Sequence, residues 1–597
     1  MSEARGLSRL RPWVLGSLSL LVLVAAAPDE SPVADASARG DVQAVRALIR
    51  EGADPNAAQA DGLTALHWAA LNNQVEIAEV LLYAGANAQP TTRLGGYTPL
   101  HLASRAGNAA VVETLLEAGA DPAVYTATGV TAMHFAAQAN ATEVIGSLVA
   151  AGADLDATDT FSNRTPLMFA SGRNATAALQ ALVEFDADVS LVTAIKDYEK
   201  ISEEATEERA RRTRVRDAAK DPEEDEEETE DTRRGGQGRQ GGGAGGGSGE
   251  PEALPNAPKA LSSIEQIGKQ GGFSALHYAA REGHIESARL LVAAGADVDQ
   301  LTAGDQSSAL LVAVINGNYD LARALLESGA DPNLVSDDDV GPLFATLNIE
   351  WSLRTWYPQP QAFRQQFTSY LDLMKLLLDA GADPNKRTIT HVWYASYNAG
   401  RMGVDFAGAT PFWRAAYATD VNAMRLLVEH GADPDIWTYN IINPRRRFGP
   451  PRPNADEDEE DPSGLPPVLH GGLGIHALHA ASGVGFGTSR VAQQHRSVPD
   501  GWLPAMKYLI EELGVDPNLR DKDGLTAVHN SAARGDNETI LYLVSQGADV
   551  TLINRRGQTT ADLANSPEQR AQPHPFTIAL LEKLGSTNNH QCRSCGG

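Results

Sequence analysis

The chain has only two cysteines in 597 residues, at positions 592 and 595. A disulfide framework therefore cannot hold its interior together. Basic residues are also few, because 49 Lys and Arg stand against 77 Asp and Glu and leave a net charge of -28. Binding to nucleic-acid phosphates needs a basic face, so the sequence predicts no nucleic-acid partner.

Common catalytic motifs are missing as well. The sequence contains no His-Glu-x-x-His, no Gly-x-Ser-x-Gly and no Gly-x-x-x-x-Gly-Lys-[Ser/Thr]. The run from Asp521 to Gly524 resembles the start of a calcium loop, but it lacks the downstream glutamate. We therefore expect no enzyme, no catalytic residue, no metal site and no cofactor.

What the sequence does contain is a repeated phrase, Gly-Ala-Asp or a close variant, at the end of apolar runs. Five of its successive spacings are 33 or 34 residues. A period in that range indicates a stack of structural repeats. The phrase begins at Gly52, Gly85, Gly119, Gly152, Gly295, Gly329, Gly381, Gly431, Gly514 and Gly547.

One repeat shows how the unit is built. Thr98 is a good N-cap and Pro99 suits the first helical position, where its missing N–H costs nothing. Gly107 permits the left-handed residue that ends this helix, and a second apolar helix over 111–116 ends at Gly119. Two short helices cannot bury so much apolar surface alone, so the unit requires neighbours on both sides.

The run Thr98-Pro99-Leu100-His101-Leu102-Ala103 matches the Thr-Pro-Leu-His-x-Ala motif of the ankyrin repeat, and the chain resembles that family. The resemblance implies an all-α solenoid of stacked helix-turn-helix units with connecting β-turn loops. We count about twelve units, caps included. In the family the motif histidine is structural, which applies here to His67, His101, His134, His277, His479 and His529.

The domain prediction follows the chain in order. Within the first insertion, residues 198–220 are charged and free of glycine, which is compatible with a solvated helix. The predicted parts are a signal peptide over 1–27, an N-terminal array over 34–193, a charged and Gly-rich disordered insertion over 194–270, a continued array over 271–336, repeats with aromatic and Pro-rich insertions over 337–520, C-terminal repeats and a cap over 521–585, and a polar tail with the cysteine pair over 586–597.

The N-terminus carries an export pattern. Three arginines precede an apolar stretch over 13–24 and a run of small residues, and cleavage after Ala26 fits best. The alternative is an uncleaved N-terminal anchor, although the stretch is shorter than a spanning helix requires. Either reading places the repeats outside the cytoplasm, in the periplasm or secreted. An exported Ala- and Gly-rich array of this kind indicates a bacterial source.

Aromatic residues gather in the later insertions, where a polar loop would not need them. Trp and Tyr anchor many interfaces. They also pack insertions back onto a solenoid, and the sequence leaves both readings open, except that Trp413 takes the motif's histidine position and is expected to be structural. The candidate protein-binding residues are Trp351, Trp356, Tyr357, Trp393, Tyr394, Trp437 and Tyr439.

The C-terminal tail holds Cys592 and Cys595 in a Cys-x-x-Cys pair. A local disulfide is the simplest reading in an oxidising compartment. A redox pair, a metal site with His590 and a degenerate haem motif stay open, although position 596 is glycine where haem attachment needs histidine.

These observations predict a protein-interaction scaffold or adaptor outside the cytoplasm. We expect a monomer that binds an unidentified protein partner through the concave face of the array and the aromatic insertions, without membrane contact beyond an uncleaved anchor. One alternative is a redox or degenerate haem-associated component that uses the cysteine pair. Another is a secreted effector that acts on a host protein.

Overall fold

A computed structural model describes residues 31–218, 252–352, 362–390, 404–442, 461–486, 497–565 and 572–590. Contacts divide the chain into two compact units, residues 1–132 with 150–153, and residues 133–149 with 154–597. The predicted signal peptide lies outside the described residues. Among the helices that are described, none combines the length and the apolar character needed to cross a membrane.

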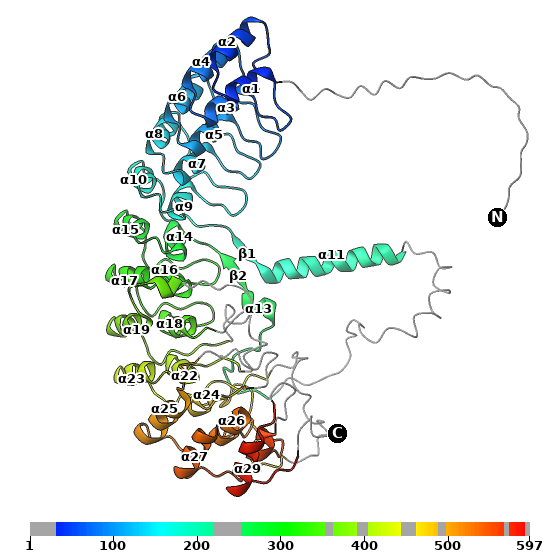
Figure 1. The fold of residues 1–597 in the computed structure, drawn as a ribbon, viewed down its shortest axis with the longest axis vertical. Coiled ribbons are helices and arrows are strands. Elements are labelled where there is room, and N and C mark those ends of the chain that lie inside the picture. The colour runs from blue at the N-terminus through cyan, green and yellow to red at the C-terminus, as the bar shows by residue number, and fades with distance from the viewer. Residues whose placement is uncertain are drawn as a thin grey trace, which may run out of the picture. The chain divides into compact units, whose positions relative to one another are not determined.

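The first unit is built from helix pairs (Figure 1). The first helices α1, α3 and α5 pack in a row, and the second helices α2, α4 and α6 pack in a row beside them. Their bounds are α1 Pro32–Ala38, α2 Val42–Arg50, α3 Ala65–Leu71, α4 Val75–Tyr83, α5 Pro99–Ala106 and α6 Ala109–Glu117.

The second unit repeats the arrangement, and with it the described residues hold twelve helix pairs, the number predicted. Its pairs are α7 Ala132–Gln138 with α8 Thr142–Ala150, α9 Pro166–Ser171 with α10 Thr176–Glu184, α14 Ala275–Glu282 with α15 Ile285–Ala293, α16 Ala309–Ile315 with α17 Tyr319–Glu327, α18 Pro342–Glu350 with α19 Tyr370–Asp379, α22 Pro411–Tyr417 with α23 Val421–Glu429, α24 Ala477–Ala481 with α25 Trp502–Lys507, α26 Ala527–Arg534 with α27 Asn537–Ser545, and α28 Thr560–Ala564 with α29 Pro575–Lys583. A π-helical turn, η3 Tyr508–Glu512, continues α25.

The helix-start and helix-end residues predicted in the repeat from Thr98 to Gly119 are confirmed. The Thr98 side chain caps α5 by accepting the backbone N–H of His101 at 3.3 Å. Gly107 ends the helix with φ of +74°. Gly119 follows α6 with φ of +87°, a conformation that costs glycine little.

In five places a buried motif histidine binds a repeat to the next, whereas the Nε2 of His529 has no partner among the described residues. In His277 the Nδ1 atom accepts the backbone N–H of Ser274 at 3.2 Å, so the proton sits on Nε2, which donates to the carbonyl of Ser307 at 3.2 Å. Burial lowers the pKa of His277 to about 4, so the ring is neutral at pH 7. The same Nε2 contact to a following carbonyl is made by His67, His101, His134 and His479.

Trp413 replaces the histidine in α22 and takes over its bond. The residue is fully buried, and its indole Nε1 donates to the carbonyl of Ile475 at 3.1 Å. Ile475 directly precedes the N-cap of α24, as Ser307 precedes the N-cap of α16. The structural role expected for this tryptophan therefore has a clear physical basis.

A second ladder of bonds runs through the Gly-Ala-Asp turns. The Asn385 backbone donates to Asp383 at 2.8 Å. Its side chain donates to the carbonyl of Gly431 at 2.9 Å and accepts the N–H of Asp433 at 2.7 Å. Asn333 makes the equivalent bonds to the turn at Gly381. The stack therefore continues past the insertions, which do not interrupt it.

The ends of the first insertion differ from the prediction of disorder over 194–270. β1 Ile195–Asp197 pairs antiparallel with β2 Lys269–Gly271. Tyr198–Ala218 forms the solvated helix α11, and Ser263–Ile267 forms the short helix α13. The strand pair closes the insertion at its base, and Ser262 and Glu265 give α13 a capping box, so these ends are ordered. Residues 219–251 lie outside the described residues.

Replacing Asn385 with alanine tests the turn ladder. The variant loses two hydrogen bonds between repeats and is expected to lower the free energy of unfolding by about 1–2 kcal/mol. Urea denaturation followed by circular dichroism measures the effect. Glu429→Ala, on the exposed face of α23, is the control and should change stability little. An equal loss in both variants would contradict the ladder.

Candidate protein-interaction surface

A turn loop precedes the first helix of each pair from α3 onward, and a backbone hydrogen bond of 2.9–3.1 Å closes it. In the repeat before α26, for example, the Asp521 N–H donates to the carbonyl of Leu525 at 2.9 Å. In each unit, we call the ends of these loops the loop-tip face of that unit. Its loops are 59–63, 92–97 and 126–130 in the first unit, and 159–164, 193–273, 302–307, 336–340, 388–409, 438–475, 521–525 and 554–558 in the second.

Neighbouring tips are joined to one another within each unit. In the first unit, Arg93 N–H donates to the Asp61 carbonyl and Ala127 N–H to the Gly95 carbonyl, both at 2.9 Å. In the second unit the same link is made from Asp337 to Asp305, from Lys522 to Gly474 and from Arg555 to Asp523, at 3.0 Å each. The face is therefore a preformed backbone surface in each unit.

Three of the insertions leave the array at loop tips. The closing bond joins Thr193 to Phe273 at 3.0 Å, Thr388 to Ala409 at 3.1 Å and Thr438 to Ile475 at 3.0 Å. The extra residues lie between those partners, so a normal repeat continues on either side. Further residues are added between the helices of two pairs, after α18 and after α24. Three insertions thus enlarge a single face, as insertions in repeat arrays often do.

Exposed apolar side chains stand on several tips. Leu94 is 81% exposed in the first unit, and Phe161 is 67% and Leu473 61% exposed in the second. Tyr125, directly before the tip loop 126–130, is 53% exposed. The sequence analysis missed all four. The signal was available, because these apolar residues fall in or beside turns that otherwise favour Gly, Asn and Asp. Phe161 also has the Lys196 ammonium 4.6 Å from its ring centroid.

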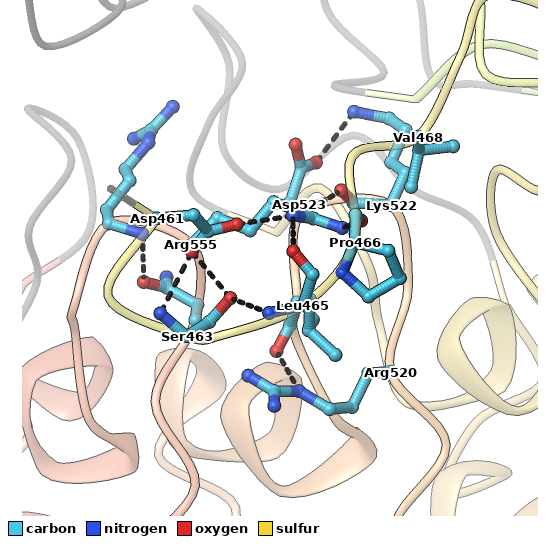
Figure 2. Close-up of polar contacts among 12 residues, drawn as sticks. Asp461, Ser463, Leu465, Pro466, Val468, Arg520, Lys522, Asp523 and Arg555 are labelled. Carbon is cyan, nitrogen blue, oxygen red and sulfur yellow. Dashed lines mark hydrogen bonds and ion pairs between the residues drawn. The ribbon is translucent and has the colours of Figure 1, made fainter. Parts of the chain in front are cut away.

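Arg555 fixes the end of the insertion that precedes α24 (Figure 2). Its guanidinium donates to a carboxylate oxygen of Asp461, to the Leu465 carbonyl at 3.2 Å and to the Pro466 carbonyl at 2.6 Å. Its Nε donates to the Lys522 carbonyl at 2.8 Å. One side chain from the last turn loop thus holds the returning insertion against the tip of its neighbour.

Asp521 lies beneath this network and is 3% exposed. Its Oδ1 accepts the N–H groups of Asp523 and Leu525, both at 2.9 Å, whereas its buried Oδ2 has no partner among the described residues. Burial raises the pKa of Asp521 to about 7, with the nearby charge of Asp523 adding to the effect. The turn therefore carries a carboxyl group that is costly to ionise.

Of the predicted binding residues, Tyr439 lies on the tip loop 438–475 and Trp437 directly precedes this loop. Trp437 borders a cavity of about 340 Å³ whose wall also includes Leu254, Leu465 and Leu473. Its ring also packs against the motif histidine His479, with ring centroids 5.8 Å apart. The Arg387 guanidinium lies 3.8 Å from the Tyr439 ring centroid. Both rings are half-buried, so each supports its loop and still reaches the surface.

Trp351 is placed elsewhere, at the end of α18. Its indole N–H donates to an Asp420 carboxylate oxygen at 3.0 Å, and the Tyr370 hydroxyl donates to the same oxygen at 2.7 Å. Burial raises the pKa of Tyr370, with the negative charge of Asp420 adding to it, which keeps the hydroxyl protonated. These contacts favour a packing role for Trp351. The other predicted site residues, Trp356, Tyr357, Trp393, Tyr394, Cys592 and Cys595, lie outside the described residues.

Comparison with protein families gives matches along both units. The model described as "Ankyrin repeats (3 copies)" matches residues 33–126 and 255–336. The model described as "Ankyrin repeats (many copies)" matches residues 493–544, and the single "Ankyrin repeat" model matches 128–160 and 407–439.

Similar curated proteins come from animals. BCL-6 corepressor-like protein 1 of Homo sapiens is 38% identical over 72 residues, 12% of this chain and 4% of that protein. Protein phosphatase 1 regulatory subunit 12A of Mus musculus is 35% identical over 71 residues, 12% of this chain and 7% of that protein. Notch-regulated ankyrin repeat-containing protein B of Danio rerio is 36% identical over 61 residues, 10% of this chain and 54% of that protein.

Thus the chain spans at most about half the length of these relatives. Among solved structures, the crystal structure of the human ASB11 ankyrin repeat domain aligns with 51% of this chain and 100% of its own, at 22% identity and a TM-score of 0.34.

Replacing Asp521 with asparagine tests the buried carboxyl group. Because its pKa rises from 3.8 to about 7 on folding, the folded state binds its proton more tightly, and stability falls as pH rises between these values. Asn keeps the two accepted N–H bonds, as Asn554 does in the next turn. We expect the variant to be more stable at pH 8 by about 1–3 kcal/mol and less dependent on pH.

Thermal unfolding at pH 5 and pH 8 measures this change. The control is Asp523→Asn, because Asp523 pairs with Lys522 at 2.7 Å and its pKa is lowered on folding. That variant should lose stability at pH 8. A gain in the control, or an unchanged pH profile in Asp521→Asn, would contradict the assignment.

Proposed function

We propose that this chain, whose matched stretches are ankyrin repeats, is a protein-interaction scaffold that binds its partner on the loop-tip face. The observation that carries the proposal is that two features occur together on the loop-tip face of each unit. Successive tips are tied by backbone bonds, and exposed apolar side chains stand on them. A preformed surface loses little conformational entropy on binding, and buried apolar anchors supply most of the affinity.

The motif histidines support a binding role over catalysis. Burial lowers the pKa of His134 to about 4 and that of His479 to about 3, and both rings make the bond between repeats. A neutral ring committed to a carbonyl is poorly suited to proton transfer at pH 7. Their positions are therefore explained by the stack.

We place the scaffold outside the cytoplasm, in the periplasm or secreted, because of the export pattern in residues 1–27. The aromatic insertions would widen the surface, with Trp437 and Tyr439 as the described residues best placed to contribute. The mature chain is proposed to begin at Ala27 and to act as a monomer. A secreted effector that binds a host protein fits the same surface, and a redox role for Cys592 and Cys595 is a separate proposal that the Cys592→Ser/Cys595→Ser variant tests.

A triple variant of the tips tests the proposed function. Leu94→Ser, Tyr125→Ser and Phe161→Ser remove exposed apolar side chains without touching a core. Partner recovery from the native extracytoplasmic fraction, quantified by mass spectrometry, is expected to fall at least tenfold, since each lost anchor contributes on the order of 1 kcal/mol or more. In the same mass spectra, the N-terminal peptide of the native protein shows whether the mature chain begins at Ala27.

The matched control removes aromatic side chains that lie away from the tips and are at least as exposed as the three tip residues. Tyr83, Phe367 and Phe576 are 97%, 94% and 85% exposed and lie at helix ends or beside them. Their replacement by serine should leave partner recovery unchanged, with both variants first checked by circular dichroism. Equal losses in the two variants would remove the basis for a tip-specific site.

A further inference from the structure

A segment of the chain itself lies on the loop-tip face of the second unit. We call residues Glu252–Leu261 the strap; they precede α13 and are not part of any helix pair. Ala253 forms a parallel bridge with His470, on the tip loop 438–475. The His470 N–H donates to the Glu252 carbonyl at 3.1 Å, and the Leu254 N–H donates to the His470 carbonyl at 2.9 Å. The strap is thus paired with the tip through one isolated parallel β-bridge.

The His470 side chain supplies a third bond to the strap. Its Nδ1 accepts the Ile442 N–H at 3.0 Å, so Nε2 carries the proton and donates to the Pro258 carbonyl at 2.7 Å. His470 is 7% exposed, so the ring sits between the strap and the loop. All three hydrogen bonds are made to backbone atoms of the strap, and none involves its side chains.

The strap also fits closely at one point. Gly471 has φ of +80°, and a Cβ placed on it would lie 2.4 Å from the Cβ of Ala257. Glycine at 471 and a small residue at 257 are therefore needed for the backbones to approach. The strap turns here and is not extended, because the Ala257 N–H donates to the Leu254 carbonyl at 3.1 Å and Asn256 has φ of +67°. The tip therefore has a surface shaped to receive a chain that pairs with His470 and then turns.

Two cavities are each lined in part by residues of the strap. Leu254 borders the cavity of about 340 Å³ that also includes Trp437 and Leu473, and Leu254 itself is 41% exposed. A second cavity, of about 330 Å³, is bordered by Asn256, Pro258 and Leu261 of the strap. Its other wall comes from the neighbouring tips, with Asp305, Asp338 and Tyr439. The strap therefore covers the surface without filling it.

This combination is typical of peptide recognition by strand addition, in which backbone bonds give affinity and side-chain pockets give specificity. We propose that the tip around His470 and Trp437 is a peptide-binding site that the strap occupies in the absence of a partner. The partner's contribution is a proline-containing peptide that carries an apolar side chain at the position of Leu254 and turns directly after it, as the strap does. This inference rests on the proposed scaffold function and adds a built-in competitor to it.

The strap's competition follows from its covalent attachment. A tethered segment competes at an effective concentration that reaches the millimolar range. A free peptide of the same sequence should therefore bind the intact chain weakly. Weakening the strap's own contacts should open the site to the free peptide.

A fluorescent peptide with the sequence of residues 252–262 is the probe, and fluorescence polarisation with the full mature chain is the measurement. The released variant carries Leu254→Asp, which places a charge in the apolar cavity, and Ala257→Arg, which collides with Gly471. We expect the peptide to bind this variant at least tenfold more tightly than the unaltered chain. Adding Trp437→Ala to the released variant should weaken that binding at least tenfold.

Two controls keep the test decisive. A peptide with aspartate at the position of Leu254 should not bind the released variant. If the released variant loses its circular dichroism signal, Leu254→Ala alone replaces it and should give the same order of affinities with a smaller ratio. Equal weak binding to the released and unaltered chains would overturn the proposal and identify the strap as a permanent brace.

The strap-peptide binding test and the partner-recovery test can fail independently of each other. The probe comes from this chain, so its binding does not depend on the identity of a partner. Loss of peptide binding counts against strap exchange alone. Equal partner loss in the tip and control variants counts against the scaffold function and leaves the peptide affinities unchanged.

Discussion

The structure depends on one constraint, which is that a single helix pair cannot bury its own apolar face. Each pair must therefore be held in register with the next, and in five repeats the buried motif histidine contributes by donating from Nε2 to the following repeat's carbonyl. His277 and Ser307 show the bond, and Trp413 and Ile475 show that an indole N–H satisfies the same geometry. The Asn ladder at Asn333 and Asn385 fixes the opposite end of the repeats. The hydrogen bonds of the histidines and of the asparagines thus fix the register of neighbouring repeats at both ends.

That constraint explains where the chain tolerates insertions. A closing bond such as Thr438 to Ile475 restores the normal turn whatever is inserted between its partners. Insertions at the tips therefore leave the stack intact and enlarge the face on which neighbouring turns are already tied together. Arg555 and the strap show that such added chain is itself fixed to the tips. A surface built in this way can diversify while its support stays constant.

Sequence predicted the repeats well because their signals are local. The cap at Thr98, the left-handed glycine at 107 and the buried His101 each follow from short-range chemistry and recur at a fixed period. The order at the ends of the first insertion was missed, because β1 and β2 are more than 70 residues apart and neither is apolar. The strap was missed for the same reason, since no local signal links Ala253 with His470. The exposure of Leu94 and Phe161 could have been predicted from the sequence, because both lie in turns between the repeated helices.

The central claim is that the partner contacts the loop-tip face. Hydrogen–deuterium exchange of the mature chain, alone and with its captured partner, tests this claim most directly. The account predicts that the partner slows exchange in the tip loops, for example 92–97 and 438–475, and leaves the second helices α4, α15 and α27 unchanged. Slowed exchange confined to those second helices, with the tips unaffected, would contradict it.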